Sequence, residues 1–249
     1  MCGDVSTRNR GVLESSTSGD RARSHRTGDD GAVTAAVIFD MDGVLIDSEP
    51  IWEQVRRDVV AEHGGRWLDG AQTALMGMST PEWAKYMSED LGVGKPPDQV
   101  SQMVIDKMAE RYEDHLPVLP GADDAVRRCA GRWPLGLASS SPRQLIDAVL
   151  RSAGWTDLFA VTVSTEELSR GKPAPDVYLT AVRALGFEPA DSVAVEDSSN
   201  GMRSATAAGL VLVAVPRPEY LPAQDAIAEA ALVLDHLDAL TADSVAALA

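Results

Sequence analysis

Short apolar runs alternate with helical patterns through most of the chain. The run at residues 35–39 is continuously apolar, as expected for a parallel strand that is covered on both faces. We expect further strands at residues 134–138, 159–163, 192–195, 210–215 and 231–234, and helices at residues 122–131, 143–153, 176–185 and 199–208. This alternation predicts an α/β fold with a Rossmann-like, doubly wound parallel sheet as its core.

One long stretch interrupts the alternation with helical patterns alone. Helices are expected there at about residues 50–63, 81–91 and 98–115. The pattern predicts a small helical cap domain at residues 50–116, inserted into a core built from residues 33–49 and 117–249. Residues 1–32 hold few apolar side chains and are rich in Ser, Thr, Gly, Arg and Asp, which predicts a disordered tail.

The chain is acidic, with 22 Lys and Arg residues against 38 Asp and Glu residues and a net charge of −16. An acidic chain repels nucleic acid and anionic membranes, and no apolar run approaches the ~20 residues that cross a bilayer. Two cysteines, Cys2 and Cys129, make no disulfide framework, which is typical of a reducing compartment. We expect a cytoplasmic monomer whose partner is a small metabolite, not nucleic acid or a membrane.

Polar side chains follow four of the predicted strands, at the point where each strand ends. They are Asp40 and Asp42 after the first, Ser139, Ser140 and Ser141 after the second, Lys172 after the third, and Glu196 and Asp197 after the fourth. Because the carboxyl ends of parallel strands lie along one edge of a doubly wound sheet, these four groups can meet.

Carboxylates gathered at one edge would repel one another. Two of them about 4 Å apart repel by roughly 4 kcal/mol at an effective dielectric constant near 20. Oxygen ligands of this kind suit Mg²⁺, which also takes substrate phosphate as a ligand. We therefore expect Mg²⁺ as the cofactor, and Lys172 as a second positive group that lets an acidic protein bind a phosphate.

The position of each side chain predicts its role. A carboxylate at a strand end can attack phosphorus to form an aspartyl-phosphate, which is the role expected of Asp40. Asp42 can protonate the leaving oxygen and later deprotonate water. Ser139 can donate a hydrogen bond to a phosphoryl oxygen, and Ser141 is expected to cap the following helix. Lys172 would neutralise charge in the transition state.

Each signal alone also has a structural explanation. An Asp-x-Asp after a strand can form a turn or a helix cap, and three serines can form a capped loop. Lys172 can be a surface lysine, and Glu196-Asp197-Ser198 can open a helix. Their conjunction, in order and each at a strand end, favours a catalytic site. A non-catalytic binding protein on the same fold is the alternative outside the enzymes.

Taken in that order, these residues resemble the motifs of the haloacid dehalogenase superfamily. The matching segments are Asp40-Met41-Asp42-Gly43-Val44-Leu45, Leu137-Ala138-Ser139, Gly171-Lys172-Pro173 and Val195-Glu196-Asp197-Ser198. The resemblance covers residues 34 to about 240 and implies a Rossmann-like core, a mobile cap and Mg²⁺-dependent phosphate chemistry. The metal ligands that it implies are Asp40, the backbone carbonyl of Asp42, and Asp197, with Glu196 beside or on the metal.

The helical cap is similar to that of β-phosphoglucomutase and of sugar-phosphate phosphatases. The mutase has a histidine where this chain has Trp52 and a cap-loop arginine where this chain has Thr80, while residues 47–52 resemble 2-deoxyglucose-6-phosphate phosphatase. We expect a phosphatase of a small phosphorylated sugar or sugar alcohol, with a phosphohexomutase as the alternative. The expected substrate-binding residues are Glu49, Trp52, Gly77 and Ser140. Trp52 is equally explained as a core residue of the cap.

Overall fold

The structure, a computed structural model, describes residues 34–76 and 78–248. The predicted tail at residues 1–32 and the predicted binding residue Gly77 lie outside this part, so both stay predictions. Within the described residues, no helix is both long enough and apolar enough to cross a membrane.

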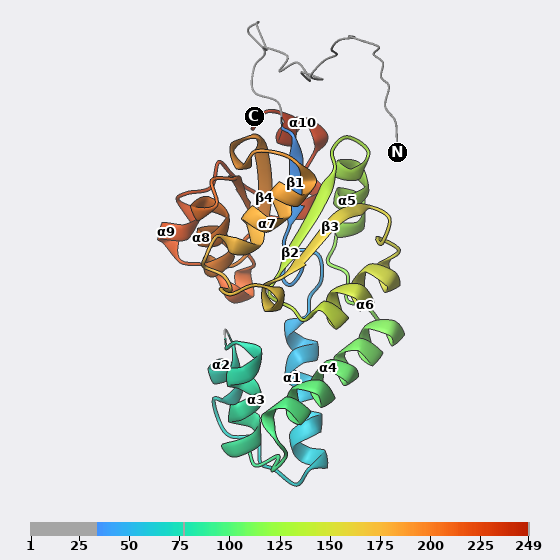
Figure 1. The fold of residues 1–249 in the computed structure, drawn as a ribbon, viewed down its shortest axis with the longest axis vertical. Coiled ribbons are helices and arrows are strands. Elements are labelled where there is room, and N and C mark those ends of the chain that lie inside the picture. Colours follow the sequence, from blue (N-terminus) through green and yellow to red (C-terminus); the bar gives the residue numbers. More distant parts are fainter. Residues whose placement is uncertain (1–33, 77, 249) are drawn as a thin grey trace, which may run out of the picture. The chain divides into compact units, whose positions relative to one another are not determined.

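One six-stranded parallel sheet forms the core, in the order β3-β2-β1-β4-β5-β6 (Figure 1). The strands are β1 (Ala36–Phe39), β2 (Leu135–Ser139), β3 (Phe159–Ser164), β4 (Ser192–Glu196), β5 (Val211–Ala214) and β6 (Leu232–Val233). The chain builds outward from β1 through β2 and β3, then returns to add β4, β5 and β6 on the other side. The doubly wound fold predicted from the sequence is confirmed, and the strand order reverses between β1 and β4, where such sheets bind ligands.

Helices join the strands and lie on both faces of the sheet. They are α5 (Ala122–Ala130), α6 (Arg143–Ala153), α7 (Asp176–Leu185), α8 (Ser199–Ala207) and the short α9 (Gln224–Ile227) and α10 (Ala242–Ala246). The predicted bounds of α6 and α7 are reproduced by the structure. Neither α9 nor α10 was predicted, because four or five residues are too few to show a helical period.

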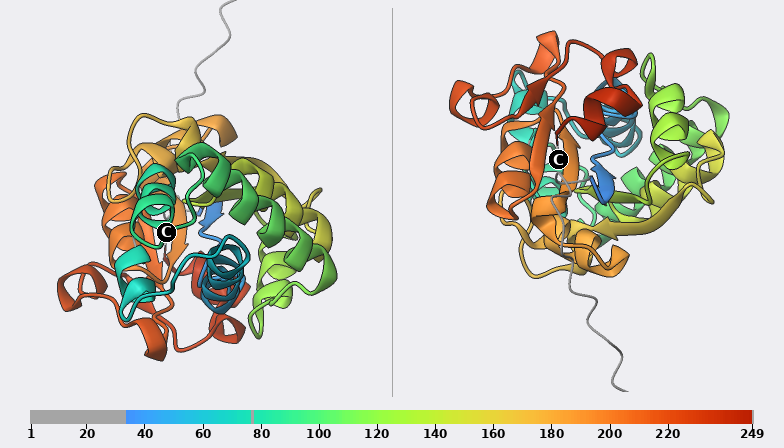
Figure 2. Two further views of the ribbon diagram at one scale, coloured as in Figure 1. Left: turned by 90° about the horizontal axis from the view of Figure 1, so that it is seen from below. Right: turned by 90° about the horizontal axis from the view of Figure 1, so that it is seen from above.

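Strand β1 lies between two hydrophobic cores. Val37 and Phe39 pack into the core that contains the apolar faces of α5 and α6, whereas Ala36 and Ile38 pack into the core that contains those of α7 and α8. Figure 2 shows the strands between these two sets of helices. Burial of both faces is the reason that the first strand has a continuous apolar run and not an alternating one.

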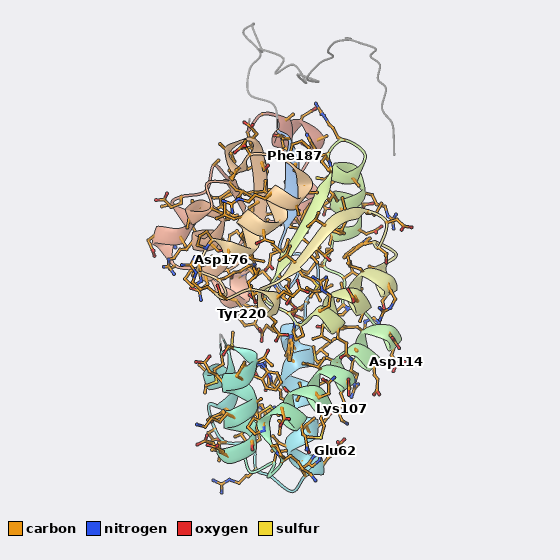
Figure 3. All side chains as sticks on the ribbon, viewed as in Figure 1. Glu62, Lys107, Asp114, Asp176, Phe187 and Tyr220 are labelled. Carbon is orange, nitrogen blue, oxygen red and sulfur yellow. The ribbon has the colours of Figure 1, made fainter. Side chains whose placement is uncertain are left out.

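Four helices precede α5 in the chain between β1 and β2. They are α1 (Glu49–Glu62), α2 (Ala71–Leu75), α3 (Thr80–Glu89) and α4 (Pro97–Asp114), of which α2 was not predicted. Helix α4 packs against α1, α3 and also α6 of the core, and Lys107 on α4 pairs with Glu62 on α1 at 2.7 Å (Figure 3). The helical insert and the sheet belong to one compact unit, so the division into a cap domain and a core domain stays a prediction.

The central strand gives a test of the fold. Ile38 is fully buried and lies between Gly136 on β2 and Ala194 on β4. We expect Ile38→Ala to lower the free energy of unfolding by about 2–5 kcal/mol, because the cavity it leaves faces a closely packed sheet. Val233→Ala, at a 47% exposed position on the edge strand, is the matched control and should cost much less. Urea unfolding measures both, and equal losses would contradict this description of the core.

Candidate active site

A buried lysine and two buried carboxylates meet at the carboxyl ends of β1 and β4. The Nζ atom of Lys172 donates to Oδ1 of Asp40 at 2.8 Å and to Oε1 of Glu196 at 2.6 Å. Asp40 is 6% exposed and Glu196 is 0% exposed. Three of the four predicted strand-end groups therefore come together, although their residues are separated by more than 150 positions in the sequence.

Glu196 accepts hydrogen bonds at both of its carboxylate oxygens. Oε1 accepts from Lys172 and, at 2.9 Å, from the hydroxyl of Tyr178 on α7. Oε2 accepts from the backbone N–H groups of Asp197 and Ser198 and from the Ser198 hydroxyl, at 3.0–3.1 Å. With both oxygens engaged, Glu196 is suited to hold Lys172 in place. Tyr178 carried no sequence signal, because a tyrosine on an apolar helix face usually serves packing.

Asp197 completes a cluster that can hold a metal ion. Carboxylate oxygens of Asp40, Glu196 and Asp197 lie within 4.8 Å of one another. Oδ1 of Asp197 is buried with no hydrogen-bond partner among the described residues. Three carboxylates and one lysine leave a formal charge of −2, which a divalent cation would balance. The residues present therefore fit Mg²⁺, with Asp197 offering an oxygen that the protein itself does not engage.

The carboxylates of this cluster are costly to keep charged. Burial raises the pKa of Asp40 from 3.8 to about 7; Glu196 and Asp42 add to the rise and Lys172 opposes it. Burial also raises the pKa of Asp197, again with help from Glu196. Burial alone would lower the pKa of Lys172, but the adjacent carboxylates of Asp40 and Glu196 reverse this and raise it. The lysine is therefore held fully charged, while Asp40 needs a further cation to be a stable carboxylate.

Asp42 is oriented by two serines at the end of β2. Its Oδ2 accepts from the hydroxyl of Ser141 at 2.7 Å and from that of Ser139 at 3.3 Å, and its Oδ1 is buried without a partner among the described residues. The expectation that Ser141 caps α6 is wrong, because Pro142 occupies the cap position without a side-chain cap. The Ser141 hydroxyl instead donates a charge-assisted hydrogen bond to the Asp42 carboxylate.

Gly43 lets the first loop pass close to the cluster. Its φ is +83°, in the left-handed region, and a Cβ atom added there would overlap the carboxylate of Asp197. The loop then folds back, with the Gly43 N–H donating to the Ile46 carbonyl at 2.8 Å. Two constraints therefore favour a glycine directly after Asp42. One is the left-handed backbone conformation, and the other is the space that the Asp197 side chain occupies.

A cavity of about 1000 Å³ extends from this cluster to the helical insert. Lys172 and Ser140 line it from the core, and Trp52 lines it from α1. Trp52 is also packed against Trp83, with 6.0 Å between ring centroids, so it belongs to the core of the insert, and its role in substrate binding stays a prediction. Glu49 is not among the lining residues; it accepts a hydrogen bond from Gln72 at 3.3 Å, and burial raises its pKa.

The parallel sheet with helices on both faces and the carboxylate cluster at its edge are the two features that define the class of this protein. The family model of the haloacid dehalogenase-like hydrolases matches residues 34–209, and the chain belongs to this family. The predicted resemblance is thereby confirmed, as is the class of the enzyme, a phosphoric monoester hydrolase.

Three known proteins illustrate the similarity. Hexitol phosphatase B of Escherichia coli K12 is 37% identical over 190 residues, which is 74% of this chain and 84% of that protein. The fructose-1-phosphate phosphatase YqaB of the same strain is 29% identical over 181 residues, or 73% of this chain and 96% of that protein. The crystal structure of a putative β-phosphoglucomutase from Thermotoga maritima superposes with a TM-score of 0.68 and 28% identity, covering 83% of this chain and 96% of that one.

The raised pKa of Asp40 predicts how stability depends on pH without metal. The folded protein retains a proton that the unfolded chain releases near pH 3.8, so stability falls as the pH rises from about 4 through about 7. We expect Asp40→Asn to remove the part of this dependence that Asp40 contributes, while Asp197, whose pKa is also raised, keeps its own part. In EDTA, the variant should gain about 2 kcal/mol or more over the wild type between pH 4 and pH 8. Urea unfolding across this range measures the difference, and a gap that is constant with pH would contradict the assignment.

The space occupied by Asp197 predicts a specific effect of Gly43→Ala. We expect this variant to lose most activity, because the new methyl group displaces the Asp197 carboxylate. Gly64→Ala is the matched control, since its φ is +74° and a Cβ atom there meets nothing within 4 Å. Both variants carry the backbone cost of about 1 kcal/mol, so thermal melting should respond to both and turnover to Gly43→Ala only. Equal turnover in the two variants would sink the steric explanation.

Proposed function

We propose that this enzyme hydrolyses the phosphate ester of a small sugar or sugar alcohol, with Asp40 as the nucleophile and Mg²⁺ as the cofactor. The observation that supports this proposal best is the buried cluster at the sheet edge. Asp40 is bound by Lys172, and an unengaged oxygen of Asp197 lies beside it. This arrangement combines a carboxylate nucleophile with positive charge at one point, as phosphoryl transfer requires.

In the first half-reaction, a carboxylate oxygen of Asp40 forms a bond to phosphorus and the ester P–O bond breaks. Asp42 gives its proton to the leaving alcohol oxygen. Lys172 keeps its charge through this step, because Asp40 and Glu196 hold its pKa high. In the second half-reaction, Asp42 takes a proton from water, the water oxygen attacks phosphorus, and Asp40 is released as the free carboxylate.

The magnesium ion would be held by Asp40, Asp197 and the backbone carbonyl of Asp42. When bound, it supplies positive charge that stabilises the phosphoryl oxygens. Glu196 acts beside it by fixing Lys172, since both of its oxygens already accept hydrogen bonds. Ser141 and Ser139 orient Asp42 for proton transfer through their hydroxyl groups.

The comparisons support a sugar or sugar-alcohol phosphate as substrate. Two similar proteins are named as phosphatases of hexitol phosphates and of fructose 1-phosphate. The cavity of about 1000 Å³ is ample for such a molecule. A hydrolase and a mutase share the first half-reaction, and they differ in whether water or a sugar hydroxyl takes the phosphoryl group.

The phosphohexomutase is the second candidate, favoured by the similarity to a protein named as a putative β-phosphoglucomutase. Two residues weigh against it. Trp52 is buried against Trp83 where the resemblance places the mutase's histidine. Thr80 donates to Glu166 at 2.5 Å where it places the cap-loop arginine.

The assay that tests both candidates uses glucitol 6-phosphate and glucose 1-phosphate with Mg²⁺. We expect free phosphate from the first, and Asp40→Asn should lower turnover by at least about 10³-fold because it removes the nucleophile. Asp147→Asn, on the outer face of α6 with its side chain 47% exposed, is the control and should leave turnover unchanged. Near-normal activity of Asp40→Asn would refute the mechanism. Glucose 6-phosphate formed from glucose 1-phosphate would instead establish the mutase.

A further inference from the structure

Among the arginines of the described residues, Arg56 on α1 is the one that is buried, with 6% of its surface exposed. No carboxylate lies within 4 Å of its guanidinium in the described part of the chain, and its Nε has no hydrogen-bond partner there. Burying the Nε–H group of Arg56 without a partner is costly, because this donor loses water and gains nothing in return. A ligand that enters the cavity can supply the acceptor that this arginine lacks.

The guanidinium of Arg56 contacts two tryptophan rings that also line the cavity. Its carbon lies 4.6 Å from the ring centroid of Trp52 and 5.3 Å from that of Trp83. These aromatic contacts stabilise the cation, while they offer no strong acceptor to its N–H groups. Arg56, Trp52 and Trp83 all line the cavity that Lys172 and Ser140 line from the core.

The other charged groups that line the cavity are already engaged. Lys172 is bound between Asp40 and Glu196, Glu82 accepts from Ser79, and Glu166 accepts from Thr80. Burial lowers the pKa of Arg56 and the charge of Glu49 opposes this, but Glu49 makes no ion pair with Arg56 within 4 Å, and its Oε2 accepts a hydrogen bond from Gln72. Among the described lining residues, Arg56 is thus the cation without a partner.

We propose that the substrate carries a carboxylate at the end remote from its phosphate, and that Arg56 binds this carboxylate. The inference rests on the proposed phosphatase function and assigns phosphorylated sugar acids as its preferred substrates, ahead of the phosphate esters of neutral sugars and sugar alcohols. The guanidinium contacts two tryptophan rings that stand edge to face, at 65° to each other. Its N–H groups can bind both oxygens of a carboxylate in a two-point contact. One unpaired cation balances a single negative charge, and this favours a carboxylate over a second phosphate.

The test compares two esters that differ only at C1, gluconate 6-phosphate with a carboxylate and glucitol 6-phosphate with an alcohol. The wild type should hydrolyse the gluconate ester with at least about tenfold higher kcat/KM. Arg56→Gln should lower kcat/KM for the gluconate ester by roughly 10- to 100-fold, the range for a hydrogen bond to a charged group. The same variant should change the value for the glucitol ester by less than about threefold, because no ion pair is lost there.

Arg57→Gln is the matched control, since Arg57 is exposed and paired with Glu53 at 2.7 Å. It should leave both kcat/KM values unchanged. Equal losses on the two esters in Arg56→Gln would show that Arg56 only supports packing, and would overturn the inference. If Arg56→Gln fails to fold, the wild-type preference decides, and equal kcat/KM values for the two esters would overturn the inference. A preference for glucitol 1,6-bisphosphate over the gluconate ester would overturn the carboxylate assignment.

Binding to Asp40→Asn separates this inference from the proposed function. Calorimetry with Mg²⁺ and gluconate 6-phosphate measures affinity without turnover, in Asp40→Asn and in the variant that also carries Arg56→Gln. If the wild type releases no phosphate from either ester but binding still depends on Arg56, the phosphatase proposal fails and the anion site stands. If both esters are hydrolysed and neither binding nor kcat/KM depends on Arg56, the phosphatase stands and the anion site fails.

Discussion

The charge on the buried carboxylates at the sheet edge constrains the rest of the site. Asp40, Glu196 and Asp197 are all buried, and among the described residues Lys172 is the cation that pairs directly with Asp40 and Glu196. The desolvation of an isolated charge in such surroundings costs several kcal/mol. Five hydrogen-bond donors stabilise the charge on Glu196. Gly201 leaves the space that this carboxylate occupies, since any side chain there would overlap it. The negative charge that remains is the charge that a divalent cation would balance.

This concentration of charge requires a rigid support, and the central strands provide it. β1 and β4 are neighbours in the middle of the sheet, and each has apolar residues in both hydrophobic cores. Stability gained by burying these strands offsets the cost of keeping Asp40 and Asp197 close together. The same two strands mark the point where the strand order reverses, so the loops that follow them diverge and leave room for a ligand.

Patterns that repeat along the chain predicted the sheet and the strand-end residues correctly. Continuous apolar runs mark strands that are buried on both faces, and the polar residues directly after them must lie at one edge. Contacts between distant residues could not be predicted in this way. Tyr178 reaches Glu196 and Ser141 reaches Asp42 only because the sheet brings them together, and neither is distinguishable by sequence from a packing tyrosine or a helix-capping serine. Helix α2 escaped prediction because five residues show no period.

The two parts of the cavity differ in what they recognise. The sheet edge supplies groups that any phosphate ester would meet, and their spacing is fixed by the strands. The helical insert supplies Trp52, Trp83 and Arg56, which lie beyond the phosphate-binding end and are held by α1 and α3. The groups at the sheet edge can be recognised from sequence motifs, because few other residues can perform phosphoryl transfer there. The residues of the helical insert face the rest of the substrate, which differs from one phosphate ester to another. The residues at the strand ends therefore indicate the reaction, whereas the substrate has to be inferred from Arg56, a buried arginine without an ion-pair partner among the described residues.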